Sequence, residues 1–179
     1  GPYEVPAGVL SIGTYAFQSC TDLTGIMLPD GLLSIGYIGF SGCTGLTRLT
    51  IPGSVRALED YAFSECTGLT DVEIAGAASI GNGAFSGCTA TTNLVLGDGI
   101  DAANGSLALS AAGTVTSNGG VNLGVLDLTG GTWRQVAASL PGFSVTDFRL
   151  GAGATFVRAL GGDGSTATPY RITDVYGLQ

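Results

Sequence analysis

Apolar residues recur along the first half of the chain in a pattern with a period of about 22–23 residues. Each unit holds a stretch in which apolar and polar positions alternate, and this period of two predicts a short strand. Proline follows three of these strands, at Pro6, Pro29 and Pro52, and ends them because it has no backbone N–H to donate. The alternating apolar positions are Leu23, Ile26 and Leu28; Leu46, Leu49 and Ile51; Leu69, Val72 and Ile74; and, more weakly, Leu94 and Leu96.

A second set of positions keeps the same spacing. A phenylalanine stands three places before each cysteine, and both residue types recur with the period of the strands. One such unit is too short to bury its own apolar side, so successive units must stack on each other. We therefore predict a β-rich solenoid of about 22–23 residues per repeat, with equivalent side chains in continuous interior ladders at a strand spacing of about 4.8 Å. The ladder residues are Phe17, Phe40, Phe63 and Phe85, and Cys20, Cys43, Cys66 and Cys88.

The combined pattern, I/L-G-x-x-A-F-x-x-C-x-x-L-T-x-I-x-L-P, resembles the leucine-rich repeats of the BspA-like, or Treponema pallidum-like, class found in bacterial surface adhesins. The likeness covers about residues 3–97, with Glu59, Ala75 and Gly97 as departures and Thr91 in place of a leucine. It implies a right-handed leucine-rich repeat coil with a parallel sheet on one side. It also implies an extracellular protein of a bacterial cell surface that binds components of host or neighbouring cells.

The second half keeps the spacing without the motif. We predict leucine-rich repeats over residues 1–97, an irregular coil or insertion over 98–125, and degenerate coils that continue the solenoid over 126–179. A separate small β domain is the alternative for the last segment. In the middle segment only Leu107–Leu109 and Val115 suggest short strands. The later coils are predicted from apolar pairs that recur with nearly the same period, which are Leu126 and Leu128, Phe148 and Leu150, and Tyr170 and Ile172.

Composition then removes several function classes. The chain has no histidine, all six of its basic residues are arginine, and its net charge is −8. Imidazole and lysine chemistry are therefore absent, and affinity for nucleic acid, which depends on clustered basic residues, is not expected. No apolar run is long enough to cross a bilayer, so this segment is not expected to insert into a membrane. We expect no cofactor, and a chain that continues in both directions in the natural protein.

The four cysteines and the clustered carboxylates each suggest a chemistry that their spacing disfavours. Zinc sites use cysteine pairs two to four places apart, whereas a separation of a whole repeat makes a line of thiols. Disulfides stay open as an alternative, but buried free thiols are favoured because parallel neighbours hold their Cβ atoms about 4.8 Å apart. Asp71 and Glu73 alternate with Val72 and Ile74, so both should face solvent rather than act as a glycosidase pair.

The outward positions of the predicted strands form the candidate ligand surface. These residues are Glu4, Met27, Arg48, Thr50, Asp71, Glu73, Asn93 and Val95. Because this face lacks aromatic side chains, Tyr15, Tyr37, Tyr61 and Trp133 are alternative anchors. We expect a non-enzymatic adhesin module that binds a protein or glycan. The alternatives are a structural spacer within a larger surface protein and a β-solenoid carbohydrate-active enzyme.

Overall fold

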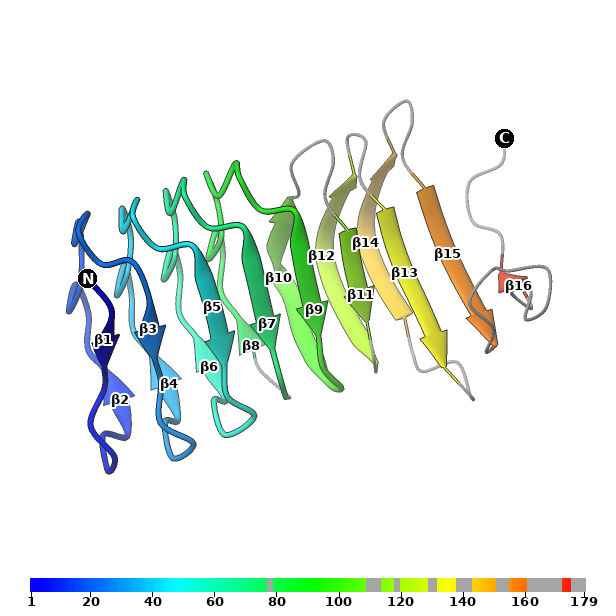
Figure 1. Ribbon diagram of the computed structural model, residues 1–179. Coiled ribbons are helices and arrows are strands. Elements are labelled where there is room, and N and C mark those ends of the chain that lie inside the picture. Colours follow the sequence, from blue (N-terminus) through cyan, green and yellow to red (C-terminus); the bar gives the residue numbers. More distant parts are fainter. Residues whose placement is uncertain are drawn as a thin grey trace, which may run out of the picture.

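The computed structural model is a solenoid in which successive coils stack along one axis (Figure 1). It describes residues 1–76, 79–108, 114–117, 120–128, 132–137, 143–150, 155–160 and 172–174, and those residues form strands and turns but no helix. The strands are β1 (Tyr3–Glu4), β2 (Ser11–Ile12), β3 (Ile26–Met27), β4 (Ser34–Ile35), β5 (Arg48–Ile51), β6 (Ala57–Leu58), β7 (Asp71–Ile74), β8 (Ser79–Ile80), β9 (Asn93–Leu96), β10 (Ile100–Ala108), β11 (Thr114–Ser117), β12 (Val121–Leu128), β13 (Thr132–Ala137), β14 (Phe143–Leu150), β15 (Thr155–Leu160) and β16 (Ile172–Asp174).

Successive coils contribute strands to two sheets on opposite sides of the solenoid. The first sheet has the order β14-β12-β10-β8-β6-β4-β2, and the second has the order β16-β15-β13-β11-β9-β7-β5, with β1 and β3 paired separately. Neighbouring strands from β1 to β15 are parallel because the chain returns to the same sheet in the same direction once per coil, whereas β16 is antiparallel to β15. The predicted parallel β-solenoid is confirmed. The resemblance implied a sheet on one side only, whereas short strands such as β2 and β4 build a second one.

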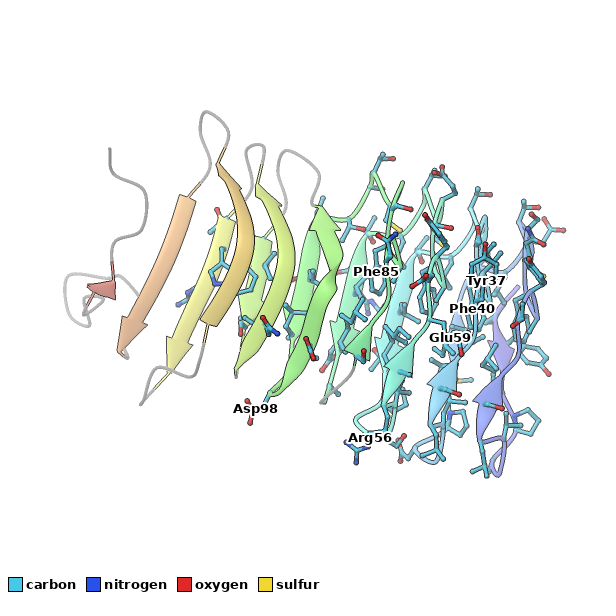
Figure 2. All side chains as sticks on the ribbon, turned by 180° about the vertical axis from the view of Figure 1, so that it is seen from behind. Tyr37, Phe40, Arg56, Glu59, Phe85 and Asp98 are labelled. Carbon is cyan, nitrogen blue, oxygen red and sulfur yellow. The ribbon has the colours of Figure 1, made fainter. Side chains whose placement is uncertain are left out.

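The phenylalanine ladder forms as predicted and fills the coils of residues 11–97. The Phe17, Phe40, Phe63 and Phe85 rings stack at centroid separations of 4.8, 5.1 and 5.4 Å, with interplanar angles of 3°, 0° and 5°. Phe40 and Phe63 are fully buried, and Figure 2 labels Phe40 and Phe85 along this file. Phe17 is only partly buried, because it belongs to the first coil and is covered by a stacked coil on one side only.

The corner around each phenylalanine turns through the left-handed region of backbone space. The positive-φ residues stand two places before and two places after the phenylalanine in every coil. They are Tyr15 and Ser19, Ile38 and Gly42, Tyr61 and Glu65, and Gly83 and Gly87. In the first three of these coils the phenylalanine donates its N–H to a carbonyl of the next coil, as from Phe40 to Ala62 at 2.7 Å. Each corner is therefore bonded to its neighbour as well as packed on it.

The described strands after residue 97 extend the same two sheets. β10 pairs in parallel with both β8 and β12, and β11 pairs with both β9 and β13. The segment 98–125, which the sequence predicted as an irregular coil or an insertion, thus contains β10, β11 and part of β12. The nine-residue β10 is longer than the short strand predicted at Leu107–Leu109, of which Leu109 lies outside the described residues. The assignment of domain boundaries stays a prediction.

The apolar pairs that the sequence predicts for the later coils align in part. Leu126 aligns with Phe148 and Leu128 with Leu150, as the repeat spacing predicts. Ile172 does not continue that row, because β16 runs antiparallel to β15 in the other sheet and places Ile172 opposite Ala159. Periodic spacing alone does not encode strand direction. Tyr170 lies outside the described residues.

Candidate functional site

The outward residues of β5, β7 and β9 form two aligned rows on the second sheet. Backbone register places Arg48, Asp71 and Asn93 in one row, and Thr50, Glu73 and Val95 in the next. On β1 and β3, Glu4 and Met27 are paired in the same way. These alignments follow from the period-two alternation, which sends Leu49, Val72 and Leu94 of the same strands into the core. The structure thus brings the predicted face together, and its role in binding stays a prediction.

Two adjoining hollows lie on this face. The first, of about 280 Å³, is lined by all six residues of the two rows. The second, of about 590 Å³, is lined by Met27, Arg48 and Thr50 together with Pro52 and other residues of the β3 and β5 coils. Since both hollows share Arg48 and Thr50, the polar rows of β5–β9 continue into a more apolar surface around the exposed Met27 side chain. Glu4 lines a further hollow beyond it, of about 370 Å³.

Asp71 is held in one orientation at the middle of the polar row. Thr70 Oγ1 donates to Asp71 Oδ2 at 2.7 Å, and Asn93 Nδ2 donates to Asp71 Oδ1 at 3.3 Å. The hydrogen bond from Thr70, then that from Asn93 and the charge of Arg48, hold the pKa of Asp71 below its usual range. Asp71 is therefore a fixed, ionised acceptor. The sequence reading missed Thr70, although the threonine after the motif leucine recurs in each coil.

The carboxylates of β7 do not resemble a glycosidase pair. Asp71 and Glu73 both face outward on one four-residue strand. A general acid needs a raised pKa, whereas that of Asp71 is lowered. Within the described parts of the chain, no three or more acidic or cysteine side chains gather in a way that could hold a metal ion. The same residues include no helix with the length and apolar character of a membrane span.

The cysteines are free thiols, and three of them donate hydrogen bonds to backbone carbonyls. Cys43 Sγ donates to Phe17 O at 3.0 Å, and Cys66 and Cys88 make the equivalent bonds at 3.2 Å. Burial raises the pKa of Cys43 to about 11, and a hydrogen bond with Cys88, together with burial, also raises the pKa of Cys66. The expectation of four buried thiols is wrong for Cys20, which is exposed because no earlier coil covers it.

The alternative aromatic anchors separate into two groups. Trp133 is fully buried, with its strand between β11 and β15, so it cannot anchor a ligand and that expectation is wrong. The three tyrosines are exposed, and their rings meet edge to face at 5.7 Å between Tyr15 and Tyr37 and 6.3 Å between Tyr37 and Tyr61. Tyr37 stands one place earlier in its coil than the other two, yet its ring joins the same file.

Comparison with known proteins supports the assignment of the repeats. The model of the BspA-type leucine-rich repeat region matches residues 3–106 in six copies. A leucine-rich repeat protein of T. pallidum, known from its crystal structure, is 25% identical with a TM-score of 0.55, over 64% of this chain and 57% of that one. A leucine-rich repeat protein from Bacteroides ovatus is 18% identical with a TM-score of 0.42, over 86% of this chain and 61% of that one.

The chain therefore spans less than two thirds of either of these solved proteins. No curated protein matches it in sequence. The family match covers more than half of the chain, includes every repeat that carries the phenylalanine and cysteine ladders, and agrees with the stacked coils seen in space. The chain belongs to the BspA-type leucine-rich repeat proteins.

Proposed function

We propose that this chain is a non-catalytic binding module of a bacterial cell-surface adhesin, and that it binds a protein or glycan of a host or neighbouring cell. Membership of the leucine-rich repeat family suggests an interaction module, and the BspA-type family consists generally of surface or secreted bacterial proteins. The binding surface is the outward face of β5, β7 and β9, with the apolar hollow beside it.

The observation that carries the proposal is the 280 Å³ hollow lined by Arg48, Thr50, Asp71, Glu73, Asn93 and Val95. It offers a guanidinium donor, fixed carboxylate and amide groups, and a partly apolar end. Asp71 is already oriented by its neighbours, so little ordering cost remains for that group when a ligand binds. The six side chains come from three rigid strands of one sheet rather than from loops.

The test is an array of host proteins and glycans probed with the chain, followed by affinity measurements on any ligand that it captures. We expect Arg48→Ser combined with Asp71→Asn to weaken binding by roughly tenfold or more, because each change removes hydrogen bonds to a charged group worth about 1.5–3 kcal/mol. Ser34→Ala combined with Ser79→Ala is the matched control on the first sheet, in the row that β4 and β8 share. Equal losses in both double variants would overturn the assignment of this face.

A structural spacer is the second candidate, and the continuous interior supports it. The ring stack and the two sheets connect each coil rigidly to the next. A module that captures no ligand on the array while staying folded would favour the spacer over the adhesin.

A further inference from the structure

Three tyrosine rings lie in one exposed file along the corners of the solenoid, away from the sheet face described above. We call Tyr15, Tyr37 and Tyr61 the tyrosine strip. Their side chains are 51%, 36% and 38% exposed, and successive ring planes cross at 80° and 85°. None of the three lines the hollows on the sheet face. The strip is therefore a separate surface that the proposed function does not use.

The backbone at the strip does not favour tyrosine. Tyr15 and Tyr61 have φ values of 59° and 57°, in the left-handed region where a residue other than glycine costs about 1–3 kcal/mol. The equivalent residue in the fourth coil is Gly83, which has a φ of 60° and shows that the corner accommodates glycine. The Tyr61 ring lies against Gly83 of the next coil, yet more than a third of each of the three tyrosines stays exposed to solvent. Ile38 has a φ of 56° at the same place in the second coil, so the strain belongs to the corner, and the exposed ring area is the feature that indicates a surface role.

The charge around the strip has one sign. The corner segments 13–22, 36–45, 59–68 and 81–90 contain Asp22, Glu59, Asp60 and Glu65 and no basic residue. Glu59 is fixed beside the strip, because its Oε2 accepts a hydrogen bond from Tyr37 N at 2.8 Å. Figure 2 shows Tyr37 and Glu59 at about mid-height of the coils and Arg56 at their lower edge. Exposed ring faces beside carboxylates attract cations and repel anions.

The spacing of the rings suits an extended chain. The phenylalanines, which occupy the same place in every coil, stack 4.8 to 5.4 Å apart. The tyrosine rings are 5.7 and 6.3 Å apart, because Tyr37 stands one position earlier in its coil than Tyr15 and Tyr61 do. Alternate side chains of an extended peptide are about 6.4–6.8 Å apart on one face. A peptide laid along the solenoid axis can therefore present every second side chain to successive tyrosines.

We propose that the tyrosine strip binds an extended basic peptide segment in which arginine or lysine occupies alternate positions. The cationic heads lie against the exposed ring faces of the strip, and Glu59, Asp60 and Glu65 of the same corner segment supply the compensating charge. Arginine binds more tightly than lysine, because its planar guanidinium stacks on an aromatic face while still donating to a carboxylate.

The test uses capped synthetic peptides and the whole chain at about physiological salt, where surface attraction over more than about 8 Å is largely screened. The first peptide carries three arginines at alternate positions with serine between them. The second has the same composition with its arginines adjacent, and the third has glutamine in place of arginine. We expect the alternating peptide to bind tightest and the glutamine peptide not to bind.

Two variants remove rings without harm to the corner. We expect Tyr15→Gly and Tyr61→Gly each to weaken binding of the alternating peptide by about two- to fivefold, the value of an exposed cation–π contact. Tyr15→Phe and Tyr61→Phe keep the ring and should bind as the original chain does. Arg48→Ser combined with Asp71→Asn, on the other surface, should leave this binding unchanged, so that failure of the strip and failure of the sheet face are distinguishable.

Three results would overturn the proposal. One is equal binding of the alternating and adjacent arginine peptides, which would indicate general attraction to an acidic protein. Another is full binding by both glycine variants. The third is tyrosine-dependent binding of neutral oligosaccharides without binding of the basic peptide, which would assign the strip to a glycan.

Discussion

The coils before and after residue 97 hold their neighbours by different contacts. In the earlier coils the strands of the first sheet are only two residues long, and stacked phenylalanines and left-handed corners supply the remaining contacts. In the later coils β10 and β12 are nine and eight residues long, and the phenylalanine and cysteine motif is absent. One coil geometry can thus be maintained by a packed corner or by a longer ladder of backbone hydrogen bonds.

Both regions nevertheless share a row of core side chains along the second sheet. Leu49, Val72, Leu94, Val115 and Trp133 are successive register partners, and all are buried. The row changes from small aliphatic side chains to a large indole where the corner phenylalanines are no longer present. The two regions therefore form one continuous sheet with two ways of filling its interior.

The largest effect should come from removing one ring in either region. We expect Phe63→Ala and Trp133→Ala each to lower the free energy of unfolding by about 3–5 kcal/mol, because each leaves a large cavity in a fully buried site. Urea unfolding followed by circular dichroism measures this loss. A loss below about 1 kcal/mol for Phe63→Ala alone would show that the earlier coils depend on their backbone bonds rather than on the ring stack.

The regions also differ in how well the sequence predicts them. The phenylalanine ladder is predictable because a nearly constant repeat length places equivalent side chains above one another. The burial of Trp133 is not predictable in this way, because Trp133 follows its register partner Val115 by less than one full repeat. The regular spacing therefore does not indicate that its side chain faces the interior. The two-residue strands of the first sheet are too short to show alternation. The left-handed corners were missed because Tyr15, Ile38 and Tyr61 are not residues that usually signal positive φ.

The candidate face shows the same limit. Its two rows follow from alternation within β5, β7 and β9, so the sequence predicts which side chains face outward. The lowered pKa of Asp71 depends on Thr70 and Asn93, of which Asn93 comes from a neighbouring coil. A contact between coils can be predicted only if the residue pairing between neighbouring strands is known. A repeat of variable length gives that pairing only approximately.

A smaller effect is expected where the fourth coil departs from the leucine motif. Thr91 occupies the leucine position and is buried, with its hydroxyl donating to Leu69 O at 2.9 Å. We expect Thr91→Val to destabilise the chain by about 1–2 kcal/mol, because it keeps the shape and removes the donor. Thermal unfolding is the measurement. Equal or higher stability in Thr91→Val would show that the hydroxyl contributes nothing where the two regions meet.

Carboxylates that bond to the backbone of the next coil should contribute less. Asp60 Oδ1 accepts from Asn82 N at 2.8 Å in the earlier coils, and Asp98 Oδ1 accepts from Gly120 N at 2.7 Å where the later ones begin. Both are exposed, and Figure 2 labels Asp98 at an edge of β10. We expect Asp60→Ala and Asp98→Ala each to cost about 0.5–1.5 kcal/mol in urea unfolding. A clearly larger cost for Asp98→Ala would mean that this contact is needed to join the two regions.

The buried thiol of Cys43 distinguishes the two regions only at alkaline pH, so its titration is expected to have the smallest effect on stability at neutral pH. All four cysteines precede residue 97, and the folded state raises the pKa of Cys43 from 9.0 to about 11. Between these values the unfolded chain loses the proton while the folded chain keeps it, so stability is complete below pH 9 and falls as pH rises toward 11. Stability measured by urea unfolding from about pH 8 to 11 should therefore fall less steeply in Cys43→Ala than in the original chain. An unchanged slope in Cys43→Ala would mean that the earlier coils do not bury this thiol, and that the difference between the two regions at alkaline pH has another source.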